Sequence, residues 1–189
     1  RVPGVVVGEA TAAIRSEQEK SYLKRKLREG KITPLANPPV FDESVIDRST
    51  HIVGMAGIEP FVEALANGAD VVIAGRSSDT SIFSAMPMMR GFNPATVWHA
   101  AKILECGAAA VVSRKTPDCM FAWVRHDHFV MEAPDPQLRC TPQSIASHSL
   151  YENADPFRLV ECSGTLDLTN SRYEALNDRA VKVSGSTFI

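Results

Sequence analysis

The chain has 189 residues, of which 44% are hydrophobic and 22% charged, a composition typical of a soluble globular protein with one substantial core. A formal net charge of −2 argues against a general nucleic-acid binder, and no apolar run reaches the roughly 18–20 residues that a membrane-spanning helix needs. The four cysteines lack the spacing of a metal site or a disulfide scaffold, so we expect reduced thiols and a cytoplasmic protein.

Predicted strands and helices alternate over residues 1–112. Short apolar runs predict strands at residues 5–7, 50–55 and 71–74. Helical periodicity that ends at glycine or proline predicts helices at residues 9–29, 58–66, 79–89 and 96–106. The alternation predicts an α/β fold in which the strands form one largely parallel sheet, layered with the flanking helices. We expect the strand at 71–74 to be buried on both faces, because all four of its residues are apolar.

Residues 118–189 are richer in β-structure. A hairpin is predicted from strands at 119–124 and 129–132, and further short strands are predicted at 158–161, 164–168 and 181–187. Thr141-Pro142 begins a helix that reaches about residue 151. We expect these strands to pair antiparallel. Residues 1–189 are therefore interpreted as a single α/β domain or as an excised fragment of a longer protein, with a strand–helix part at 1–112 and a β-rich part at 118–189.

The candidate ligand site follows the predicted strand at 71–74. Gly75, Arg76, Ser77 and Ser78 form a polar turn before a helix, where free N–H groups and the positive helix end favour an anion. Arg76 can bind a carboxylate or phosphate through its planar fork, and Asp79 can orient Arg76 or act as a base. In the structural alternative, Asp79 caps the helix and Arg76 pairs with it.

The end of the helix at 96–106 supplies a second candidate for proton transfer. A carboxylate at a helix C-terminus is electrostatically unfavourable, so Glu105 is either exposed or held by a partner such as Arg76. The neighbouring Cys106 is expected to be a small buried residue and not a nucleophile, because the helix C-terminus raises the pKa of a thiol.

His126 and His128 are the one close histidine pair in the sequence. We interpret them as exposed residues of a hairpin turn, with a two-histidine grip on zinc as the alternative. The dinucleotide, P-loop and hydrolase-elbow motifs are absent from the sequence, which therefore identifies no cofactor and no metal site.

Several segments, in order along the chain, resemble the AtuA-like family, named for acyclic terpene utilisation. These segments span about residues 50–189 and comprise residues 57–65, the stretch from Gly68 through Arg76 to Asp79, residues 104–108, residues 150–152 with Asp155-Pro156, and residues 179–185. Two departures from the family pattern stand out. Ala101-Lys102-Ile103 replaces a Gly-His pair that usually precedes Leu-Leu-Glu-Cys-Gly, and residues 88–92 replace an aromatic His-x-Phe-Gly-Trp run.

The resemblance implies a cytoplasmic bacterial protein of branched isoprenoid catabolism that acts on organic acids or their acyl-CoA esters. It attaches no fixed reaction to the chain. His99 lies close to the position of the missing family histidine, which makes it a further substrate-binding candidate. The resemblance also implies that a glycine-rich segment of the family lies before Arg1.

Two hypotheses of function remain open. In the first, the chain is an enzyme or enzyme subunit in which Arg76 binds an organic acid or acyl thioester and Asp79 or Glu105 transfers protons. In the second, it is a binding or assembly module without chemistry. The expected partner is a small molecule rather than a nucleic acid or a membrane. A sheet edge left open before Arg1 would be covered in a homo-oligomer.

Overall fold

The computed structural model describes residues 7–10, 13–14, 17–33, 39–50, 52–113 and 119–189. Its strands are β1 (Val7–Ala10), β2 (Ala13–Ile14), β3 (Ile52–Val53), β4 (Val71–Ala74), β5 (Phe121–Val124), β6 (His128–Glu132), β7 (Arg158–Glu161), β8 (Gly164–Asp167), β9 (Arg172–Ala175), β10 (Val181–Ser184) and β11 (Thr187–Phe188). The helices are α1 (Glu17–Arg28), α2 (Glu43–Arg48), α3 (Glu59–Ala66), α4 (Asp79–Met89), α5 (Pro94–Glu105) and α6 (Pro142–His148), and a short 3₁₀ turn spans Gly107–Ala109.

The expected largely parallel sheet is wrong. Among the described residues, β1 and β4 are the one pair of parallel strands, and they form a sheet of two strands. The predicted strand at 50–55 does not join them, because β3 pairs antiparallel with β2 instead. An apolar run predicts that a segment is extended. Which strand pairs with that segment depends on tertiary contacts, which the run itself does not reveal.

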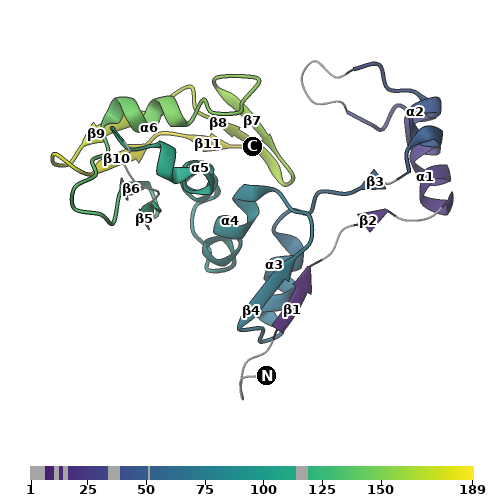
Figure 1. Ribbon diagram of the computed structural model, residues 1–189, viewed down its shortest axis with the longest axis horizontal. Helices are drawn as coiled ribbons and strands as arrows, with labels where there is room; N and C mark the ends of the chain where they lie inside the picture. Colours follow the sequence, from purple (N-terminus) through teal and green to yellow (C-terminus); the bar gives the residue numbers. More distant parts are fainter. Residues whose placement is uncertain (1–6, 11–12, 15–16, 34–38, 51, 114–118) are drawn as a thin grey trace.

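All strand pairing after residue 118 is antiparallel. One sheet has the order β5-β6-β10-β9 and the other the order β11-β8-β7. Strand β9 is absent from the sequence prediction, because its four residues are mostly polar and carry little apolar alternation. The C-terminal sheets form one body with α5 and α6, as the teal, green and yellow ribbons of Figure 1 show.

One local prediction near the N-terminus is also wrong. Among the described residues, the predicted helix at 9–29 is helical over Glu17–Arg28, and Ile14 lies in a strand instead of on the helix's apolar stripe. The predicted strand at 5–7 agrees with β1 at Val7, and its other two residues lie outside the described residues. In β4, Val71 and Ile73 are 45% and 62% exposed, because α3 covers one face of a two-stranded sheet.

Helix α5 is the centre of the packing. It contacts α4 on one side and strands of both C-terminal sheets on the other. One core cluster places Ile103 of α5 against the inward residues of the four-stranded sheet, among them Phe129 and Val181. In a second cluster, Trp98 of α5 stacks on Phe188 of β11, with 5.5 Å between the ring centroids and 5° between the ring planes.

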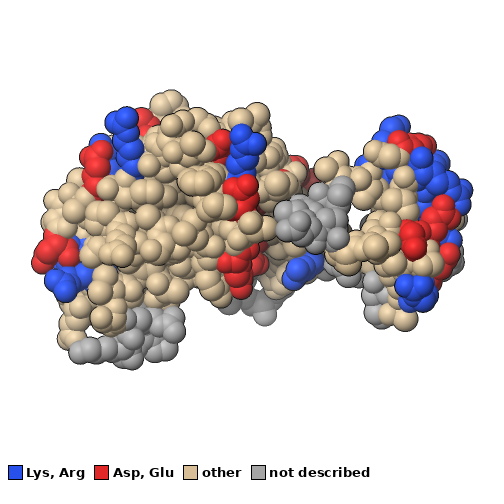
Figure 2. All heavy atoms as spheres, turned by 90° about the horizontal axis from the view of Figure 1, so that it is seen from above, with Lys and Arg blue, Asp and Glu red and all other residues tan. Residues whose placement is uncertain are grey.

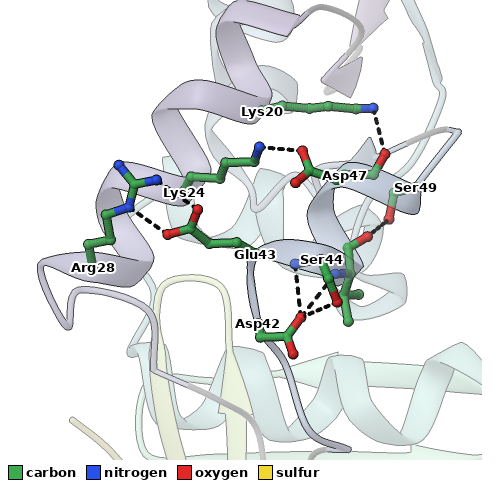
Figure 3. A network of polar contacts seen from close by, with 9 residues as sticks. Lys20, Lys24, Arg28, Asp42, Glu43, Ser44, Asp47 and Ser49 are labelled. Atoms are coloured by element: carbon green, nitrogen blue, oxygen red, sulfur yellow. Dashed lines mark hydrogen bonds and ion pairs between the residues drawn. The ribbon is translucent and has the colours of Figure 1, made fainter.

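Helices α1 and α2 form a hairpin that lies apart from the rest of the chain in Figure 1. Side chains of both charge signs crowd this hairpin in Figure 2. Figure 3 shows that Lys24 pairs with Asp47, while Arg28 Nη2 donates to Glu43 Oε2 at 2.7 Å. Lys24 and Arg28 of α1 are thus partnered by acids of α2, whereas Arg25 and Lys26 lie near Glu29, just after α1. No helix in the described part of the chain is both long enough and apolar enough to cross a membrane.

Candidate functional site

A cavity of about 470 Å³ lies where three parts of the chain meet: the turn after β4, the last turn of α5, and the loop from α6 into β7. Its size is within the range of about 300–1,000 Å³ that is usual for small-molecule sites. The cavity is lined by residues 55, 76–80, 102, 105, 152–155 and 158–161. Four of the predicted site residues from the β4–α4 turn, Arg76, Ser77, Ser78 and Asp79, are among them, and so is Glu105. Gly75 and His99 are not.

The turn between β4 and α4 is fixed by its backbone. Ala56 donates its N–H to the carbonyl of Arg76 at 3.1 Å and accepts the N–H of Ser78 at 2.9 Å. Ser78 is the N-cap residue of α4, and Asp79 is the first residue of the helix. The structure therefore differs from the expected cap, because Asp79 follows the cap position and Ser78 occupies it. The two hydrogen bonds hold Arg76 and Ser77 at the cavity wall.

Arg76 and Asp79 are both exposed, and each lines the cavity. Neither side chain makes a hydrogen bond or ion pair with any other residue in the described part of the chain. The alternative in which Arg76 and Asp79 pair with each other is therefore not what the structure shows. The guanidinium of Arg76 is open to a ligand.

Three cations line the cavity, and two of them have acidic partners. Lys102 pairs with Glu105, three residues later on α5, and each side chain is only 9% exposed. Arg158 Nε lies 3.6 Å from Asp167 Oδ2. Glu105 is thus held by Lys102 and not by Arg76. Among the cations of the lining, Arg76 is the one without an ion pair to a described residue.

Glu161, at the end of β7, is a cavity residue that the sequence analysis missed. Its Oε2 accepts hydrogen bonds from Ser78 Oγ at 2.9 Å and from Thr80 Oγ1 at 2.8 Å. Burial raises the pKa of Glu161, the two hydroxyl hydrogen bonds oppose that rise, and the nearby Glu105 carboxylate adds to it. The available signal was strand alternation, since Glu161 shares a face of β7 with the buried Leu159.

The loop before β7 forms the remaining wall. Asp155 Oδ1 accepts the N–H groups of Phe157 and Arg158 at 2.7 and 2.9 Å, which is ordinary turn chemistry. Asn153 donates from its amide to the carbonyl of Ser149 at 2.5 Å. Both Asn153 and Asp155 also line the cavity. Turn-forming residues thus supply a polar wall as well.

His99 lies in the core, outside the cavity lining. Its side chain is 0% exposed, with Nδ1 at 3.2 Å from Ser186 Oγ and Nε2 at 3.3 Å from Ser149 Oγ. Its ring makes an edge contact with Phe129, and Tyr173 OH lies 3.4 Å from Nε2. Burial lowers the pKa of His99 to about 3, so the ring is neutral. In this position His99 ties α5 to α6 and to the C-terminal strands.

Cys106 is exposed, which differs from the buried position expected for it. Partial loss of solvent around the thiol raises its pKa, and the carboxylates of Glu105 and Glu152 raise it further. His126 and His128 lie at the β5–β6 turn, where His128 Nδ1 is 2.7 Å from Asp127 Oδ1. The described residues contain no group of three or more His, Cys, Asp or Glu side chains arranged to hold a metal ion.

The β4–α4 turn lies within the part of the chain that matches a known protein family. The model of the acyclic terpene utilisation family protein AtuA matches residues 4–114, from before β1 to beyond α5. The match begins earlier than the resemblance at about residue 50 indicated, and it includes Arg76, Asp79 and Glu105 but not Glu161. No curated protein and no solved structure matches the chain significantly. A match over more than half of its length, covering the turn that builds the cavity, shows that the chain belongs to the acyclic terpene utilisation (AtuA) family.

Proposed function

We propose that the cavity binds a small branched organic acid or its acyl thioester in the cytoplasmic breakdown of acyclic terpenes. One observation carries the proposal: Arg76 presents a guanidinium to the cavity without an ion pair to any described residue. An unpaired arginine at the wall of a cavity is a natural partner for a carboxylate or a polarised carbonyl. The four cysteines lack the spacing of a disulfide scaffold, which agrees with a reducing compartment.

The rest of the lining suits such a ligand. Met55, Ala154, Leu159 and Val160 provide apolar surface for a branched hydrocarbon chain. Ser77 and the first residues of α4 lie beside Arg76, where the positive end of an eleven-residue helix adds to the attraction for negative charge. The cavity thus combines an anion-binding end with apolar walls.

Binding is common to both hypotheses of function. In an enzyme, Asp79 is the better candidate for proton transfer, because Glu105 is already paired with Lys102. In a binding module, the same cavity would take the ligand without reaction. The first experiment therefore measures binding, and analysis of the recovered ligand after incubation distinguishes an enzyme from a binding module.

Thermal unfolding and calorimetry with 3-methylbut-2-enoate and its coenzyme A thioester test the proposal. At a ligand concentration of about 100 times Kd, the parent chain should gain roughly 2.7 kcal/mol of stability. Arg76→Ala should lose this gain. Arg90→Ala is the matched control, because Arg90 is also an exposed arginine of the α4 region but does not line the cavity. Failure of the parent chain to bind either compound, or equal binding by Arg76→Ala, would overturn the proposal.

A further inference from the structure

We infer that the ligand of this cavity is a free carboxylic acid rather than a coenzyme A thioester, and that its carboxylate binds together with one proton taken up by Glu161. The inference rests on the proposed function, because it names the ligand class and the ionisation state of the same site. It follows from the charges of the lining and from the hydrogen bonds of Glu161.

The charge of the lining disfavours coenzyme A. Five acidic side chains surround the cavity, at positions 79, 105, 152, 155 and 161, against basic side chains at 76, 102 and 158. Lys102 and Arg158 are engaged by Glu105 and Asp167, which leaves Arg76 to meet the ligand. The phosphates of coenzyme A carry several negative charges and need a cluster of basic residues. One open guanidinium matches one carboxylate.

The carboxyl group of Glu161 is held on one side only. Its Oε2 accepts the hydroxyls of Ser78 and Thr80, and Thr80 is only 2% exposed. Its Oε1 makes no hydrogen bond within the part of the chain that the structure describes. The hydroxyls fix the plane of the carboxyl group, so that Oε1 is left to serve the ligand. A protonated Oε1 donates a hydrogen bond, whereas an ionised one can only accept.

The charged surroundings of Glu161 favour the protonated form once a ligand is present. Asp79 on α4, Glu105 on α5, Glu152 and Asp155 on the loop, and Arg76, Lys102 and Arg158 share the cavity with it, and Cys162 follows it in the chain. Burial already raises the pKa of Glu161 in the free chain, and Lys102 opposes this only weakly. The carboxylate of a bound ligand repels the ionised form of Glu161 and therefore raises the pKa of Glu161 further. Uptake of a proton from solvent converts that repulsion into a hydrogen bond to the ligand.

Calorimetry in buffers of different ionisation enthalpy, such as PIPES and Tris, measures the protons taken up on binding. With 3-methylbut-2-enoate, the parent chain should take up close to one proton above the pKa of Glu161, and its affinity should fall about tenfold per pH unit there. Glu161→Gln keeps a donor at the same place, so it should bind the acid with no proton uptake and little dependence on pH. Glu63→Gln, the same change at an exposed glutamate of α3 that does not line the cavity, should behave like the parent chain.

The outcomes separate the two proposals. Tighter binding of the thioester than of the acid would overturn the ligand class, and binding of the acid without proton uptake would overturn the role of Glu161. Both results would leave the proposed function standing, whereas no binding of either compound would remove it along with this inference.

Should Glu161→Gln fail to fold, Thr80→Val provides the second test. It removes a hydrogen bond that lowers the pKa of Glu161, so the fall in affinity should move to higher pH. An unchanged profile would count against the inference.

Discussion

Glu161 accepts a hydrogen bond from Thr80 across 81 positions of the sequence, with 2.8 Å between Oε2 and Oγ1. This contact joins the end of β7 to the first turn of α4. A strand hairpin from the C-terminal half of the chain thereby completes the wall of a cavity that begins at the β4–α4 turn. The family match ends at residue 114, so the contact links the matched region to the part of the chain beyond it.

The carboxyl of Glu161 should make the stability of the chain depend on pH. Its pKa in the folded state is raised above the ordinary value of 4.5, chiefly by burial. Its contribution to stability is therefore complete below about pH 4.5 and is lost as the pH rises through the folded-state pKa. Glu161→Gln should remove this loss. The free energy of unfolding of the variant should therefore increase relative to that of the parent chain as the pH rises. Urea unfolding at several pH values measures the difference, and a constant difference would show that Glu161 ionises normally.

Arg76 should be dispensable for folding and needed for binding. Because its side chain is exposed and has no ion pair to a described residue, Arg76→Ala should change the free energy of unfolding by no more than about 0.5 kcal/mol. Arg76→Lys keeps the charge but loses the planar fork, so a bidentate contact to a carboxylate should weaken by roughly 1–3 kcal/mol. Chemical denaturation and calorimetry of both variants check the two parts. A stability loss of about 3–5 kcal/mol for Arg76→Ala would instead mark a buried ion pair.

Gly185 should be intolerant of a side chain. It has a φ of +84°, and a Cβ there would lie 2.4 Å from the carbonyl oxygen of Asn170. Gly185→Ala should therefore cost roughly 2–4 kcal/mol, from the left-handed backbone and the backbone clash together. It should also displace the adjacent Ser186 from His99. Gly91→Ala is the matched control, because Gly91 has a φ of +76° with open space around it and should cost only about 1–2 kcal/mol. Equal losses in the two variants would contradict the clash.

Local signals in the sequence predicted α3, α4 and α5 within a few residues. Proline at the start of α3 and α5 and glycine after α4 are visible without any tertiary information. The polar turn from Gly75 to Ser78 was visible for the same reason. The hairpin of β5 and β6 is confirmed, since strand alternation and the turn between the strands are also local.

Long-range pairing was not visible in the sequence. The run at residues 50–55 carries no mark of its partner β2, and the apolar β4 gives no sign that one of its faces stays uncovered. Glu161 was missed because the sequence does not show that the end of β7 packs against the β4–α4 turn, where Glu161 contacts Ser78 and Thr80. His99 was a candidate because it lies close to the position of the missing family histidine, but its side chain packs in the core among Ser149, Ser186 and Phe129.

His99 should make the chain sensitive to mild acid. The folded state holds its ring neutral down to about pH 3, whereas the ring of the unfolded chain takes up a proton near pH 6.5. The unfolded state therefore binds more protons between these values, and stability falls as the pH falls. At pH 5 the loss from this residue should be about 2 kcal/mol relative to pH 8. His99→Gln should be less stable than the parent chain at pH 8. Because glutamine does not titrate, the variant should lose less stability on acidification. His148, whose pKa burial also lowers, contributes a slope of the same sign in both proteins. Urea unfolding of the two proteins at pH 5, 6, 7 and 8 measures the slopes, and parallel slopes would mean that His99 is reached by water in the folded chain.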